Sequence, residues 1–345
     1  MTPTGTHSWN AFLDNQGILV RRCYSAVTLD WYPVAMRLFV VGIVLAGSLF
    51  GQVHFTHEKD RVAVTIDGRA FGSLYFGQDA NKPFFHPLTT PSGVKVTRSY
   101  PVEKSAEEEP VDHPHQKGLW IGVERLSGMD FWENDSSYTR PRMGKIVFKD
   151  VTKLEAAGNQ GELRFRADWI NREGVPVIGE DRTMIFYAGK GSAHVLDVDL
   201  TLTARIPVSF EDHQDAVIGT RLSPAFDEKN GGIAINAEGL RGEKEARGKA
   251  SRYLYWQTRA GQATVGVAIL DHPENWNSPA RWHLRSFGFF TANPFARRVF
   301  DAKAPPADKS LRAGEALRLR YRVLVYSGDL DMEAQWREYT RAVRP

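Results

Sequence analysis

The chain has 345 residues, of which 42% are hydrophobic and 25% are charged, and these values are ordinary for a globular protein with a sizeable core. Its formal net charge is only +3, and Lys and Arg alternate with Asp and Glu, so we set nucleic-acid binding aside. The single cysteine, Cys23, excludes an internal disulfide.

The first patterned segment is 36–52. Met36 and Arg37 precede an apolar run that ends in small residues, which is the order of a secretory signal peptide. The run is shorter than the roughly 20 residues that cross a bilayer, so we expect cleavage near Gly51 or Gln52, export to the periplasm or beyond, and no stable membrane span afterwards. An uncleaved signal anchor is the alternative. The signal peptide implies that residues 1–35 are a non-native extension.

From residue 53 onward the hydrophobic pattern has mostly a period of two, which predicts strands with one solvated face. The clearest examples are 194–203, with apolar residues at every second position, and 317–323, where arginines take the solvated side. We expect further strands at 62–66, 94–98, 145–151, 163–169, 183–187, 232–236, 253–258 and 263–269.

One helix is predicted, from about Leu330 to Val343. Its apolar stripe consists of Met332, Trp336 and Tyr339, and Asp329 or Asp331 can cap its first turn. Many short strands and one helix predict an all-β fold. We therefore expect one domain, 53–345, built as a large antiparallel β-sandwich with a short C-terminal helix.

Ionisable and aromatic side chains concentrate between residues 112 and 133. Buried ionisable groups need partners that a plain core lacks, so this mixture favours one wall of a concave, solvated site. The segment contains Asp112, His113, His115, Lys117, Trp120, Asp130, Phe131, Trp132 and Glu133.

The pair His113 and His115 has two interpretations. In an extended segment both rings lie on one side, about 7 Å apart, and can reach one ion or one substrate. A two-histidine, one-carboxylate metal site could then be completed by Asp130, Glu133 or a distant acid. Alternatively, His115 hydrogen-bonds the backbone and stabilises a loop.

Trp120 and Trp132 lie beside Lys117, Asp130 and Glu133 in the sequence. Sugars require this combination, because their C–H faces pack on aromatic rings while their hydroxyls take polar partners. Core packing is the alternative for each tryptophan taken singly.

Two later segments also mix rings, imidazoles and charges. The first follows the strand that ends at Ile269, a place where loops form sites. In the second, Glu238 and Arg241 are either a substrate carboxylate and its clamp or a surface ion pair. The first segment contains Asp271, His272, Trp282, His283, Arg285 and Asn293.

Six stretches resemble, in order, an uncharacterised bacterial family catalogued as methane oxygenase PmoA-like. The name implies methane oxidation, but the sequence lacks the set of apolar 20-residue segments of the membrane methane monooxygenase subunit. Gln116 stands where the family often has a further His, and 213–215 stands where it has Thr-Lys-Glu. The stretches are 85–94, 112–120, 128–132, 236–243, 271–273 and 282–295.

The leading hypothesis is an exported sandwich of galactose-mutarotase-like or related form that binds or transforms a carbohydrate or another small polar substrate. As an enzyme it would be a hydrolase, lyase or epimerase, with a histidine as general acid or base. The expected catalytic residues are His113, His115, Asp130 and His283. The expected substrate-binding residues are His86, Lys117, Trp120, Trp132, Glu238, Arg241, Asp271, His272, Trp282, Arg285 and Asn293.

Two alternatives stay open. The first is an oxygenase that uses a divalent metal ion held by the His113–His115 pair and a carboxylate. The second is a lectin-like module with the same aromatic surface and no catalytic pair.

Overall fold

The computed structural model describes residues 7–13, 19–25, 51–77, 80–104 and 109–341. Residues 1–48 and 49–345 are separate compact units. In the first, β1 (His7–Leu13) and β2 (Leu19–Ser25) form an antiparallel pair. The expected signal peptide lies outside the described residues except for 51–52, so both it and the upstream extension stay predictions. Within the described ranges, no helix has the length and apolarity to cross a membrane.

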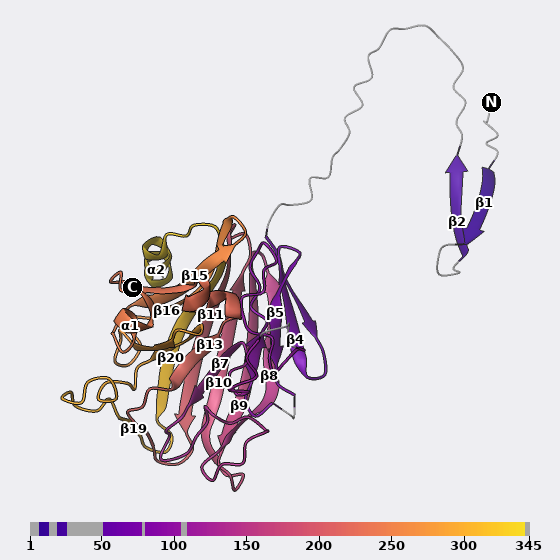
Figure 1. The fold of residues 1–345 in the computed structure, drawn as a ribbon. Helices are drawn as coiled ribbons and strands as arrows, with labels where there is room; N and C mark the ends of the chain where they lie inside the picture. Colours follow the sequence, from indigo (N-terminus) through magenta and orange to yellow (C-terminus); the bar gives the residue numbers. More distant parts are fainter. Residues whose placement is uncertain (1–6, 14–18, 26–50, 78–79, 105–108, 342–345) are drawn as a thin grey trace. The chain divides into compact units, whose positions relative to one another are not determined.

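Two eight-stranded antiparallel sheets make up the larger unit (Figure 1), which confirms the predicted fold class. The first sheet has the order β14 (Ile233–Asn236), β15 (Tyr253–Ala260), β16 (Ala263–Asp271), β20 (Ala316–Ser327), β11 (Ala193–Ala204), β10 (Pro176–Tyr187), β9 (Gln160–Ile170) and β8 (Lys145–Ala157). The second has the order β17 (Arg281–Arg285), β18 (Phe289–Asn293), β13 (Ala216–Arg221), β7 (Leu119–Val123), β6 (Phe84–His86), β5 (Arg69–Tyr75), β4 (Arg61–Ile66) and β3 (Val53–His57). A separate pair joins β12 (Val208–Phe210) to β19 (Lys309–Leu311).

The main core lies between the two sheets. Phe71 and Phe85 of the second sheet contact Phe186 of the first, with ring centroids 6.1 and 5.8 Å apart. At the other end Trp256 of β15 meets Phe290 of β18 at 6.1 Å. Each sheet therefore has an inner face toward this core and an outer face away from it.

The predicted alternation is confirmed in β11 and β20, which are neighbours in the first sheet. The leucines at 196, 200 and 202 are fully buried, whereas the acids between them pair with arginines across the outer face. Asp197 pairs with Arg322, and Asp199 pairs with Arg318. The solvated side of these strands is thus a ladder of opposite charges, which stabilises an antiparallel pair.

The other strand predictions coincide with β4, β8, β9, β10, β14, β15 and β16. The one at 94–98 is wrong, because this segment makes only isolated bridges, Thr89 to Lys95 and Thr97 to Leu222. Most strands of the second sheet were not predicted. Every residue of β7 and β13 is buried, so these strands show no alternation to read.

The predicted C-terminal helix is α2 (Met332–Arg341). The backbone N–H of Ala334 donates to Asp331 Oδ1 at 2.9 Å, which confirms Asp331 as a cap. Met332 and Tyr339 are buried against β16 and β20, so the helix covers the outer face of the first sheet at one end. A shorter helix, α1 (Gly242–Ala246), follows β14.

Candidate functional site

Aromatic rings form a cluster on the outer face of the second sheet. Phe84, Trp120 and Phe289 alternate along their strands with residues of the main core, and Trp132 packs on them from a loop. The Trp120 and Trp132 rings are 5.1 Å apart. A Cβ on Gly219 would lie 2.6 Å from the Trp132 ring, so this position of β13 requires glycine. We call these four rings the aromatic floor.

Lys82 is buried beside the aromatic floor, with 3% exposure. Its ammonium donates to the backbone oxygen of Trp132 at 2.5 Å and to Asn134 Oδ1 at 2.6 Å, and it lies 6.0 Å from the Trp120 ring. Burial lowers the pKa of Lys82 to about 7. The lysine therefore holds the loop that carries Trp132, which we call the Trp132 loop. Because the pKa of Lys82 is near neutral, its charge responds to nearby groups.

Asp130, a predicted catalytic residue, begins the same loop. Its Oδ1 accepts hydrogen bonds from the backbone N–H groups of Trp132 and Glu133, at 2.8 and 2.9 Å. Burial raises the pKa of Asp130 to about 6. Glu133 pairs with Arg140. Both acids expected to complete a metal site with the histidine pair are thus engaged within the loop.

His113 and His115 do not lie in an extended segment, and that expectation is corrected. His113 has a φ of +44°, and the N–H of Gln116 donates to its carbonyl at 2.9 Å, so the chain turns here. The two rings are nevertheless close, with centroids 5.7 Å apart. Nδ1 of His115 lies 3.4 Å from the Tyr138 hydroxyl.

His115 is 2% exposed. Burial and the neighbouring charges of Lys82, His113 and Arg140 hold the pKa of His115 well below its usual range. The imidazole is therefore neutral at physiological pH, and a neutral imidazole can accept a proton.

Two buried arginines hold the turn at residues 113–116, which we call the histidine turn, in place. Arg98 donates to Asp112 at 2.5 Å and to the His113 carbonyl at 3.0 Å. Arg221 of β13 donates to Gln116 Oε1 at 2.8 Å. Lys82, Arg98, Tyr138 and Arg221 were not predicted as site residues, since each stands alone in the sequence.

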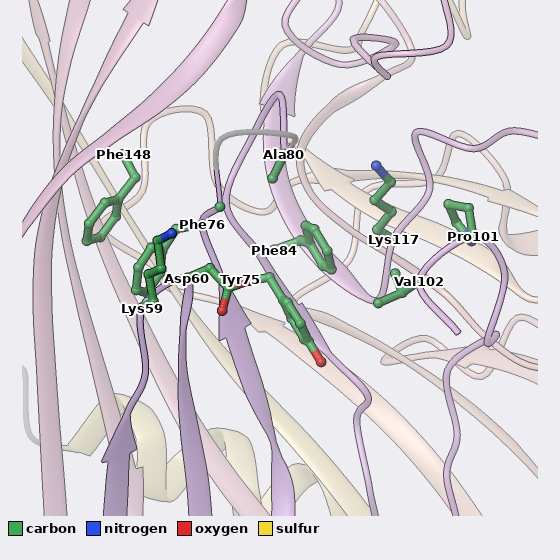
Figure 2. A pocket seen from close by; sticks show the side chains of 11 residues that line it. Lys59, Asp60, Tyr75, Phe76, Ala80, Phe84, Pro101, Val102, Lys117 and Phe148 are labelled. Carbon is green, nitrogen blue, oxygen red and sulfur yellow. The ribbon is translucent and has the colours of Figure 1, made fainter. Parts of the chain in front are cut away.

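A hollow of about 650 Å³ opens beside the histidine turn. Figure 2 shows the Tyr75 and Phe84 rings side by side, and they stack at 5.1 Å with 9° between their planes. Lys117 directly follows the turn in the chain and lines the hollow; its amine is 5.7 Å from the Phe84 ring and 2.6 Å from Asp135. The lining consists of Lys59, Asp60, Tyr75, Phe76, Gly77, Ala80, Phe84, Pro101, Val102, Lys117 and Phe148. We call it the Tyr75–Phe84 hollow.

His283 belongs to a separate cluster on the same face. Its Nδ1 lies 3.1 Å from Asp215 Oδ1, and His213 Nδ1 lies 3.0 Å from Glu124 Oε2. Glu124, His213 and Asp215 each offer a ligand atom within 4.8 Å of the other two, a geometry that suits a metal ion. Asn293, a predicted binding residue, donates to the His213 carbonyl at 2.7 Å.

Two predicted binding residues, His86 and Trp282, are buried. A Cβ on Gly118, two residues after the histidine turn, would lie 2.9 Å from the His86 Cβ. His86 is 1% exposed, with Thr97 Oγ1 at 3.5 Å and Glu103 at 3.6 Å, and burial lowers its pKa to about 4. Trp282 is completely buried in the main core and donates to the Ser251 carbonyl at 2.9 Å. The Trp282 side chain, on β17, faces the core between the two sheets, so its role in binding a substrate stays a prediction.

Asp271 and His272 lie on the first sheet. Asp271 accepts from Ser278 Oγ and the Ala280 N–H at 2.8 Å each, and burial raises its pKa to about 6. The His272 ring is 5.2 Å from that of Tyr339 in α2. Both residues therefore stand apart from the histidine turn.

The remaining predicted residues surround α1. The N–H of Glu238 donates to Asn236 Oδ1 at 3.1 Å, and the N–H of Arg241 donates to Glu245 at 2.9 Å. Arg285 pairs with Glu243 at 3.2 Å. These contacts belong to a turn beside β17.

The larger unit is similar to two solved structures. A GalM/aldose epimerase homologue from C. elegans is 8% identical, with a TM-score of 0.31, over 81% of this chain and 100% of that chain. A putative aldose 1-epimerase from Escherichia coli K12 is 10% identical, with a TM-score of 0.27, over the same shares. At these values no function follows from the similarity.

The sequence comparisons give a family and no curated relative. No curated protein matches the chain. The resemblance to the PmoA-like family stays a prediction. The model of a family described only as being of unknown function, DUF6807, matches residues 61–339, so the chain belongs to that family.

Proposed function

We propose that the chain binds a carbohydrate in the Tyr75–Phe84 hollow and presents it to the histidine turn. The observation that carries this proposal is a stacked pair of rings joined, through the Lys117–Asp135 ion pair, to a buried neutral imidazole. The turn from Asp135 to Tyr138 completes the link, since the Tyr138 N–H donates to the Asp135 carbonyl at 3.0 Å.

The hollow has the chemistry that sugar binding needs. Tyr75 is half-buried and stacks on the buried Phe84 ring, so its open face can offer a flat apolar surface to the C–H face of a pyranose. Asp60, Lys59 and Lys117 stand around these rings and can bond hydroxyls or a carboxylate. The lysines favour an acidic or keto sugar over a plain neutral one.

The histidine turn supports proton transfer as the reaction. His115 is neutral, and the Tyr138 hydroxyl is beside it; the low pKa of His115 makes it a weak base but, once it has taken up a proton, a strong acid. Arg140, and Lys82 when it is protonated, would stabilise negative charge that develops when a sugar carbon loses a proton. This arrangement suits an epimerase or a lyase.

Binding is tested by calorimetry with a panel of neutral, acidic and keto saccharides. Replacing Tyr75 by Ala removes half of the ring stack and should lower affinity about tenfold, equivalent to about 1.4 kcal/mol. Tyr255→Ala, a half-buried tyrosine of the first sheet, is the matched control. Equal losses in the two variants, or no saccharide bound by the unaltered chain, would contradict the proposal.

Catalysis is tested by NMR of the bound saccharide. His115→Gln should abolish turnover, or exchange of a sugar C–H proton with D₂O, while affinity stays within a few-fold. Binding without turnover or exchange in the unaltered chain would favour the lectin-like alternative.

Export is also proposed, and its support is the sequence of 36–52 alone. Intact-mass analysis of the chain from its native host should give a start near Val53. A mature chain that retains Thr2 would contradict both the signal peptide and the start at Met36.

A further inference from the structure

We propose that Glu124, His213 and Asp215 bind a divalent transition-metal ion of the Zn²⁺ or Mn²⁺ class, and that His283 positions Asp215 for it. The site is distinct from the His113–His115 pair and from the Tyr75–Phe84 hollow. It does not depend on the proposed carbohydrate function.

The topology of the second sheet places the two acids opposite each other. β7 and β13 are antiparallel neighbours in which Val123 pairs with Ala216, so Glu124 and Asp215 face each other just beyond the paired ends. The Glu124 N–H donates to the Asp215 carbonyl at 3.0 Å. Like charges directly across an antiparallel pair are destabilising. A bound cation would turn this repulsion into attraction.

His213 adds a nitrogen ligand to the two acids. It lies two positions before Asp215, and Asn293 of β18 anchors its carbonyl. The distance of 3.0 Å between His213 Nδ1 and Glu124 Oε2 is close to the separation of neighbouring ligands on one ion, since metal-to-ligand distances of about 2.0–2.2 Å place them about 3.0–3.5 Å apart. One imidazole with two carboxylates suits Zn²⁺ or Mn²⁺ better than Ca²⁺, which prefers oxygen alone.

The side chains of Glu124 and His213 are each 20% exposed. An ion can therefore enter from solvent, and water or a substrate oxygen can complete its coordination.

His283 provides an observation independent of these three ligands. It is 4% exposed, its Nδ1 is 3.1 Å from Asp215 Oδ1, and its Nε2 has no hydrogen-bond partner within the described part of the chain. A buried ring nitrogen without a partner costs free energy, so packing alone does not favour an imidazole here. Carboxylates that ligate metals are commonly oriented by such a second hydrogen bond. The ring at 283 is thus placed to hold the Asp215 oxygens toward the ion.

The metal cluster adjoins the aromatic floor. The Phe289 ring lies 5.3 Å from the His283 ring and 6.3 Å from the Trp132 ring. The Trp132 loop itself is next to Glu124, since the Phe131 N–H donates to the Val123 carbonyl at 2.8 Å.

The test is calorimetry of the full chain, freed of metal by a chelator, with Zn²⁺ and with Mn²⁺. One ion should bind per chain. His213→Ala and Asp215→Asn should each lower affinity about 100-fold, and Glu124→Gln provides a third variant if either fails to fold by circular dichroism. His54→Ala removes an exposed imidazole and should leave affinity unchanged.

The positioning role of His283 has its own readout. His283→Ala should lower metal affinity about 10-fold to 100-fold. His283→Asn keeps a donor near the place of Nδ1 and should restore most of it. Equal losses in the two variants would overturn this role.

The alternative metal site is tested in parallel with His113→Ala. If that variant loses metal while His213→Ala keeps it, the ion belongs to the His113–His115 pair and the present proposal is wrong. The proposal also fails if the unaltered chain binds neither ion, whatever the saccharide experiments show.

Discussion

The outer faces of the two sheets carry their charges in opposite ways. On the first sheet, Arg318 and Arg322 pair with acids across the strands, and a hollow of about 480 Å³ there is lined by such pairs. On the second sheet, Lys82 and His115 are buried, and burial shifts the pKa of each away from its charged form. The paired charges of β11 and β20 are therefore neutralised locally, whereas Lys82 and His115 are held in place at an electrostatic cost.

Burial along the strands shows the same difference. β9 alternates between buried and exposed residues, whereas β7 is buried throughout because loops such as the Trp132 loop cover its outer face. Enclosing charged groups in this way costs free energy that a purely structural layer would not require. Such a covered layer is where a functional site is expected.

The largest expected contrast between the two faces is in stability. Trp120→Ala removes a fully buried ring of the aromatic floor and should lower the free energy of unfolding by about 3–5 kcal/mol. Arg166→Ala removes an exposed partner of Asp150 on the first sheet and should cost about 0–1 kcal/mol. Urea denaturation measures both. Similar losses would break the distinction between the faces.

The pH dependence of stability sharpens the comparison. The pKa of Lys82 is about 7 in the folded chain and about 10.5 when unfolded, so between these values the unfolded chain binds more protons. Stability should therefore rise with pH across this window, by at most about 1.4 kcal/mol per pH unit, and be lost again as pH falls toward 7.

Lys82→Met should flatten the dependence of the free energy of unfolding on pH above 7. The check is to measure that free energy for the variant and for the unaltered chain at pH 7, 8 and 9. Lys149→Met on the first sheet, whose side chain is 55% exposed, should leave the slope unchanged. Parallel profiles for the unaltered chain and the Lys82 variant would contradict a buried, proton-releasing lysine.

The smallest expected effect is on the charge ladder of the first sheet. Asp199→Asn breaks a forked but exposed pair with Arg318 and should cost about 0.2–1 kcal/mol. The loss should shrink as salt is raised, because exposed pairs are screened. If the free energy of unfolding fell by several kcal/mol even at high salt, the first sheet too would depend on a specific ion pair.

The candidate site could be predicted only in part. The segment around His115 is visible in the sequence as a local concentration of rings and charges. The structure places His115 within electrostatic reach of Lys82, whose ammonium lies 6.0 Å from the Trp120 ring. Arg98 and Arg221 could not be recognised, because each gains its meaning from Asp112 and Gln116, which are distant along the chain or on another element.

The sequence by itself determined the alternating strands of the first sheet and the helix α2, because local periodicity reports which side of an element meets solvent. Only the tertiary structure decided the second sheet and its clusters. Strands buried on both faces carry no alternation, and the pairing of β7 with β13 joins residues 93 to 101 positions apart in the chain. That register sets Glu124 opposite Asp215, which His283 contacts from β17, and long-range pairing of this kind depends on the packing of the whole sheet.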